Sequence, residues 1–251
     1  MKIVYSSGLG CPKIIDDKFV LEQVDNSTDF VDNIKRNLKG VKKMVFISNR
    51  WDKITSLAQP GDEVFTDFHY TNEEYAKAVR TCFAKAKLVF NEMVIVDGEY
   101  NGNLKKELKD ADFVYIQGGH TTRGLKVLED LKFKNALEEF DGTILVTGTA
   151  AKLLATKILS TQNLVDFNIE KGLGIKDYSV RPFFKHTLKY KFKKGHRTRV
   201  RLLKNFSKEI DVYAMGYLSY IIDLGHELQF YGPCYLFKNG KLRKVKKTST
   251  R

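Results

Sequence analysis

Short runs of β-branched and aromatic residues alternate along the chain with longer segments whose apolar residues recur at helical spacing. The runs predict buried strands at residues 2–5, 44–48, 94–96, 113–116 and 143–146. The segments between them predict helices at residues 30–38, 73–87, 103–109 and 121–131, with Asn72 as N-cap of the second. Repeated strand–helix units of this length favour an α/β fold, a doubly wound, mostly parallel sheet with helices on both faces.

The last third of the chain has a different pattern. Aromatic-rich strands are predicted at residues 180–184, 213–223 and 235–237, around a basic helix near residues 197–205. Residues 238–241 read Lys-Asn-Gly-Lys and predict a hairpin turn, because Asn-Gly adopts the backbone that such turns require. Since no linker-like run interrupts the chain, we expect one domain over residues 1–245 and a basic, disordered tail over residues 246–251.

Residues 142–154, GTILVTGTAAKLL, carry the most specific local pattern. A buried strand runs directly into a turn of small residues, and a helical pattern begins at Lys152. This order is typical of a nucleophile elbow, in which one side chain is held at the tip of the turn against a helix N-terminus. We expect Thr149 at the tip. Registers that place Gly148 or Ala150 there also fit, and either would remove the hydroxyl.

A second glycine turn follows the strand predicted at residues 113–116. It contains Gly118 and Gly119, and in a doubly wound sheet it lies at the same C-terminal edge as the elbow. Backbone N–H groups of Gly118, Gly119 and Ala150 are therefore predicted to form an oxyanion hole facing Thr149.

The segments YIQGGHTTRGL and GTILVTGTAAKLLA resemble those of the peptidase E (aspartyl dipeptidase) and cyanophycinase family, which has the class I glutamine amidotransferase-like fold. The family carries Gly-Gly-Asn-Thr where this chain has residues 118–121, and Gly-x-Ser-Ala-Gly-Ala where it has residues 147–152. The resemblance in the general pattern of residues extends from residue 1 to about residue 241. It implies a serine-type hydrolase of amide or dipeptide bonds, acting on a small peptide or other small acidic ligand, with no cofactor.

The chain departs from this family at the residues that carry the chemistry. The family's serine falls on Thr149, and its histidine base falls on Phe183, which cannot take a proton. The acidic third member falls near residues 163–166, where only Asp166 is a carboxylate, and a later acidic residue falls on Tyr217. Losing the base removes several orders of magnitude of rate. Two hypotheses follow: a hydrolase with Thr149 as nucleophile and an unusual base, or an inactive member that binds a ligand or a partner.

Other side chains are candidates for the missing roles. His120 lies on the glycine turn and is a candidate base, with Asp166 as its orienting group; a plain N-cap or cleft position explains His120 as well. His186 is a second candidate, if the chain there leaves the strand. Arg123 and Lys152 flank the two turns and are candidates for binding an acidic ligand, although a solvated helix surface also accounts for them.

Composition adds limits on partners and location. The net charge is +13, and residues 185–204 contain nine Lys or Arg and no acidic residue. This stretch indicates either a solvated face or a face that binds polyanions such as nucleic acids. The scattered cysteines (Cys11, Cys82 and Cys234) and five histidines predict neither a disulfide framework nor a structural metal. Without a predicted signal peptide or membrane span, we expect a cytoplasmic protein.

Overall fold

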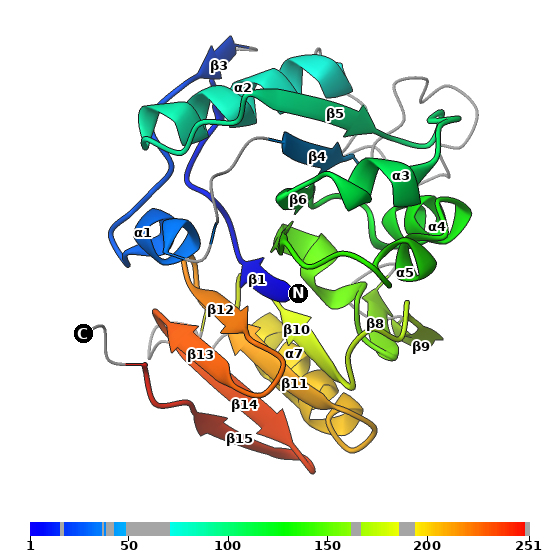
Figure 1. The fold of residues 1–251 in the computed structure, drawn as a ribbon. Coiled ribbons are helices and arrows are strands. Elements are labelled where there is room, and N and C mark those ends of the chain that lie inside the picture. The colour runs from blue at the N-terminus through cyan, green and yellow to red at the C-terminus, as the bar shows by residue number, and fades with distance from the viewer. Residues whose placement is uncertain are drawn as a thin grey trace.

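The computed structural model describes residues 1–15, 18–36, 38, 43–48, 71–161, 167–185 and 194–248. Its main feature is a seven-stranded sheet with the strand order β13-β12-β1-β7-β6-β4-β5 (Figure 1). The strands are β1 (Lys2–Ser6), β4 (Lys43–Ile47), β5 (Glu92–Val96), β6 (Phe113–Ile116), β7 (Thr143–Thr147), β12 (Tyr220–Asp223) and β13 (Leu228–Tyr231). The first five in chain order pair in parallel, whereas β12 and β13 add antiparallel to the free side of β1.

Helices cover both faces of this sheet, and the strands supply a separate set of side chains to each face. Along β1, Ile3 and Tyr5 enter one hydrophobic cluster while Val4 enters the other, as the two-residue period of a strand requires. The cluster containing Val4 includes residues of α1 (Phe30–Lys35) and α2 (Asn72–Lys85). The other includes residues of α3 (Leu104–Lys109), α4 (Thr121–Asp130) and α5 (Phe133–Ala136). The predicted doubly wound α/β fold is confirmed.

The last third of the chain builds a second, four-stranded sheet that the sequence pattern did not predict as separate. Its order is β10-β11-β14-β15, with strands β10 (Tyr178–Arg181), β11 (Asp211–Met215), β14 (Cys234–Lys238) and β15 (Lys241–Lys244). Figure 1 shows these strands together with the basic helix α7 (Lys194–Phe206) in yellow to red. The single strand predicted over residues 213–223 is wrong, because a turn containing Leu218 at φ 54° sends β11 and β12 into different sheets.

Two hairpins complete the described structure. β2 (Lys13–Ile15) pairs with β3 (Lys18–Val20), and β8 (Lys157–Thr161) pairs with β9 (Phe167–Lys171). The predicted turn between β14 and β15 is confirmed, with Asn239 at φ 49° and Gly240 at φ 75°. Thr248, in the predicted tail, exchanges hydrogen bonds with Phe230 of β13.

The start of α2 differs from the prediction by one residue. Thr71 is the N-cap, and it forms a capping box with Glu74. Asn72 is instead buried, where its side chain bonds Ser48 after β4 and Asp97 after β5. A side-chain network therefore ties the C-terminal ends of these two strands to the helix.

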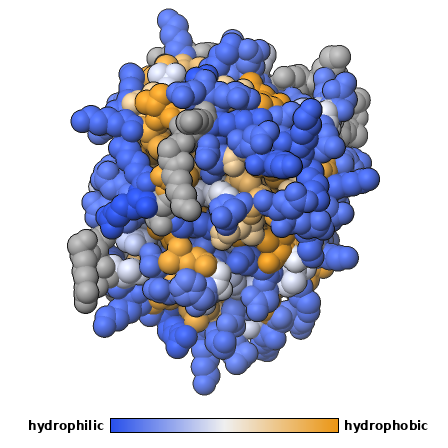
Figure 2. Space-filling model, viewed as in Figure 1, coloured by the Kyte–Doolittle hydropathy of each residue, from blue (hydrophilic) through white to orange (hydrophobic). Residues whose placement is uncertain are grey.

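The visible face of the molecule is mostly hydrophilic, with apolar residues in small patches between polar side chains (Figure 2). No helix within the described residues is long and apolar enough to cross a membrane.

Candidate functional site

The two glycine turns meet at the C-terminal ends of β6 and β7. The strands are parallel neighbours, and beyond them the amide of Gly118 donates to Thr147 Oγ1 at 3.2 Å and that of Gly119 to Thr149 Oγ1 at 2.9 Å. A Cβ at Gly118 would lie 2.8 Å from the carbonyl oxygen of Thr147, so only glycine allows this approach. The expectation that the two turns converge is confirmed.

The helical part of the elbow is shorter than predicted. β7 leads into a single 3₁₀ helix, η3 (Gly148–Lys152), and the chain then leaves helical geometry instead of continuing through residues 153–155. The cause is a tertiary contact, because the backbone carbonyls of Leu153, Leu154 and Ala155 accept hydrogen bonds from residues 173–176, which run alongside. These bonds replace the intrahelical ones, although the side chains suit a helix.

The strained backbone position of the elbow belongs to Gly148. Its φ is 52°, in the left-handed region that favours glycine, and Thr149 follows within the 3₁₀ helix. A Cβ built at Gly148 would lie 3.7 Å from Phe183 Cε2 and 3.7 Å from Gly118 Cα, which are ordinary contacts. In a nucleophile elbow, the reactive side chain occupies this strained position. Of the registers considered, the backbone therefore favours the one with Gly148 at the tip.

Thr149 lies beside this tip with its hydroxyl turned toward the glycine turn. The hydroxyl donates to the carbonyl oxygen of Gly119 and accepts from the Gly119 amide at 2.9 Å. The Gly119 N–H is therefore occupied by threonine rather than open for an oxyanion, and that of Gly118 is occupied by Thr147. Oxyanion binding by Gly118, Gly119 and Ala150 stays a prediction, as does the nucleophilic role of Thr149.

The remaining candidates for acid–base roles lie around α4 or outside the described residues. His120 is the half-buried N-cap residue of α4, and its side chain makes no capping hydrogen bond. Arg123 lies half-buried in the first turn of the same helix. Asp166 and His186 lie outside the described residues, so their predicted roles stay predictions.

The position expected for the family's base is occupied by an aromatic ring in contact with the elbow. Phe183 has a φ of 56° and is 48% exposed, and its ring lies against both Gly148 and Gly8. Tyr217, at the predicted position of the later acidic residue, is also exposed. It lines a pocket of about 720 Å³ with residues that follow β1, among them the ion-paired Lys13 and Glu22.

Lys152 is not on a solvated helix surface, and that explanation for it is wrong. It ends η3 with 5% of its surface exposed, and its Nζ donates to the carbonyl oxygen of Leu159 at 3.3 Å. Burial and the nearby positive charge of Arg181 lower its pKa to about 8. Sequence reasoning missed Arg181 altogether. The available signal was a charged residue between Val180 and Pro182, at the end of a strand pattern.

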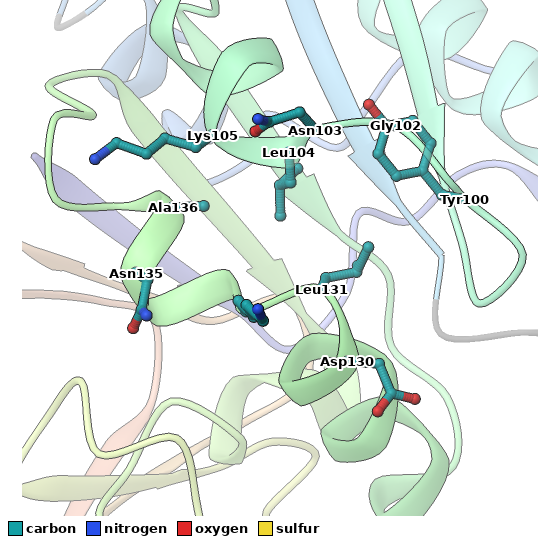
Figure 3. A pocket seen from close by; sticks show the side chains of 10 residues that line it. Tyr100, Gly102, Asn103, Leu104, Lys105, Asp130, Leu131, Asn135 and Ala136 are labelled. Carbon is teal, nitrogen blue, oxygen red and sulfur yellow. The ribbon is translucent and has the colours of Figure 1, made fainter.

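A separate pocket of about 430 Å³ lies between the start of α3 and the turn that joins α4 to α5. Figure 3 shows Asn103 and Leu104 on one side of it and Leu131 and Asn135 on the other. None of the predicted site residues lines this pocket. Within the part of the chain that the structure describes, no three His, Cys, Asp or Glu side chains are grouped so that they could hold a metal ion.

Comparison with known proteins points to one family. The model of peptidase family S51 matches residues 67–217, more than half of the chain. The crystal structure of a peptidase from an acI-B1 Actinobacterium is similar over 99% of this chain and 95% of its own, with a TM-score of 0.65 and 12% identity. A candidate peptidase E protein from Listeria monocytogenes EGD-e is similar over 98% of each chain, with a TM-score of 0.51 and 17% identity. No curated protein sequence matches significantly. The two structural likenesses support the fold.

Proposed function

Because the chain belongs to peptidase family S51, we propose that it retains the family's cleft as a ligand-binding site and has lost serine-type hydrolysis at the elbow tip. One observation carries the proposal. The strained elbow position is Gly148, and the side chain that a Cβ there would face is Phe183. A hydroxyl nucleophile and its base would be expected at these two positions.

The chemistry explains why this pair argues against hydrolysis. Glycine offers no hydroxyl to attack a carbonyl carbon, and a phenyl ring has no lone pair to accept the proton of a neighbouring hydroxyl. Without both groups, only binding and oxyanion contacts would remain to accelerate amide cleavage. Packing of the glycine turn against the elbow needs neither group, so the shape of the site is retained.

A second candidate function is amide hydrolysis with Thr149 as nucleophile. It is supported by the position of the Thr149 hydroxyl, which lies between the two glycine turns. For attack, this hydroxyl must rotate away from the Gly119 carbonyl and meet a base. His120, the residue next to Gly119, is the first candidate for that base.

Labelling with a serine/threonine-directed fluorophosphonate separates the two candidates. We expect neither the natural protein nor its Thr149→Ala variant to be labelled. The double variant Gly148→Ser with Phe183→His serves as the positive control. A Cβ at Gly148 makes only ordinary contacts, and the strain of a side chain at φ 52° is the strain that a nucleophile elbow normally carries. Labelling of the natural protein that disappears in Thr149→Ala would overturn the proposal and make His120→Ala the next variant to test.

A further inference from the structure

A buried lysine and a neighbouring arginine form a cationic cluster next to the elbow. Lys152 ends η3, which packs against β10, and Arg181 is the last residue of β10. The positive charge of Arg181 acts on Lys152, and that of Arg199 on α7 acts on Arg181. Each cation therefore lies in the field of another, which is unfavourable without a negative charge nearby.

The described part of the chain provides no carboxylate bound to either side chain. The side chain of Lys152 has one hydrogen bond, to a backbone carbonyl, and no ion pair with a described residue. Arg181 is half-buried, and its guanidinium makes no hydrogen bond or ion pair to a described residue. Glu170 of β9 is the carboxylate whose charge reaches Lys152, and it is not within ion-pair distance. Buried cations in proteins are normally paired, because desolvation of an isolated charge is costly.

We propose that Lys152 and Arg181 form a binding site for an oxyanion, a carboxylate or a phosphate group carried by a ligand of this protein. A guanidinium binds two oxygens of such a group through parallel N–H bonds, and the lysine ammonium adds a third donor at the buried end. The proposal states which class of ligand the protein binds, and it therefore rests on the ligand-binding function proposed above. Neither cation belongs to the Gly148–Phe183 pair, so the two proposals are tested by different variants.

Thermal unfolding of the full chain tests the site. Inorganic phosphate and acetate are titrated separately at constant ionic strength maintained with sodium chloride, on the natural protein and on Lys152→Met and Arg181→Gln. Lys244→Met and Arg243→Gln on β15 are matched controls, because they make the same chemical changes at exposed positions. We expect a saturable rise of the natural protein's melting temperature, on the order of 4 °C, with at least one anion.

The rise should be lost in Lys152→Met and Arg181→Gln and kept in both control variants, and the anion with the lower half-saturation concentration identifies the group. A rise that does not saturate, or that persists in all variants, would reflect the general positive charge and overturn the proposed site. If Arg181→Gln does not fold, Lys152→Met decides alone. Fluorophosphonate labelling reports on the proposed loss of hydrolysis independently, so failure of one proposal is distinguishable from failure of the other.

Discussion

At the scale of single residues, three positions define the candidate site. Gly148 has no side chain at the strained position, and Phe183 has no proton acceptor facing it. Lys152, four residues after Gly148, carries a charge into the protein interior. A buried charge of this kind lowers the stability of the folded protein unless a ligand or a partner compensates the charge. Binding proteins often tolerate such a loss of stability at their binding sites.

Replacing Lys152 by methionine should stabilise the protein at neutral pH. The pKa of Lys152 is lowered from 10.5 to about 8, so the folded protein binds its proton less tightly than the unfolded chain does. The cost is fully present below pH 8 and disappears as the pH rises toward 10.5. We expect Lys152→Met to raise the free energy of unfolding by roughly 1–3 kcal/mol at pH 7.

Urea denaturation at a series of pH values measures this effect. The difference between the natural protein and Lys152→Met should shrink from pH 8 to pH 10.5, while Lys244→Met should show no comparable dependence. A constant difference across this range would mean that packing, not the charge, causes it.

At the scale of elements, the main sheet and the second sheet are joined by a buried polar cluster. Lys176, just before β10, forms an ion pair of 2.6 Å with Asp223 at the end of β12, and Tyr178 of β10 donates to the same carboxylate at 2.5 Å. Asp223 is almost fully buried, and the Tyr178 hydroxyl also lies 3.4 Å from that of Tyr5 in β1. The cluster therefore fixes β10, and with it Arg181, relative to the parallel strands.

Removing the cation from this cluster should be strongly destabilising. In Lys176→Met, the carboxylate of Asp223 stays buried with Tyr178 as its remaining side-chain partner, and we expect a loss of about 3 kcal/mol in the free energy of unfolding. Chemical denaturation measures the loss. The double variant Lys176→Met with Asp223→Asn should recover part of it, because no unpaired charge remains. Equal losses in the single and double variants would rule out the charge as the cause.

At the scale of the whole molecule, the sequence predicted the parallel part of the fold well and the rest poorly. Strands such as residues 113–116 are short, apolar and followed by helical spacing, so local pattern is sufficient. The aromatic pattern over residues 213–223 looks continuous, and the turn at Leu218 depends on two sheets that the sequence does not show.

For the candidate site too, the sequence predicted some features and missed others. The meeting of the two glycine turns follows from parallel neighbours in the sheet, and it was predicted. The burial of Lys152 was not, because it depends on the packing of β10 against η3 and on the contact of its side chain with Leu159 of β8. The small residues of the elbow allow three registers, with Gly148, Thr149 or Ala150 at the tip. Only the backbone geometry distinguishes these registers, and it favours Gly148.

The net charge of +13 gives a prediction that belongs to the molecule as a whole. Any binding of duplex DNA through the basic residues 185–204 should weaken steeply as the salt concentration increases, because binding releases counterions from the phosphates. Thr149→Ala should bind like the natural protein, whereas Arg197→Gln with Arg201→Gln, both exposed on α7, should bind more weakly with a shallower salt dependence. Fluorescence anisotropy across a salt series measures this, and equal binding by both variants would exclude the α7 face.

The place of β1 in the main sheet has a consequence for how the chain is made. β1 lies between β7 and β12, so the strand of the main sheet that is made first is also an inner strand of the finished sheet. One of its edges stays unpaired until residues Tyr220–Asp223 have been synthesised. Until then, this edge is exposed to other chains, and edges of this kind promote aggregation. Completion of the sheet, and of the candidate site at its C-terminal edge, therefore has to wait until β12 and β13 have been synthesised.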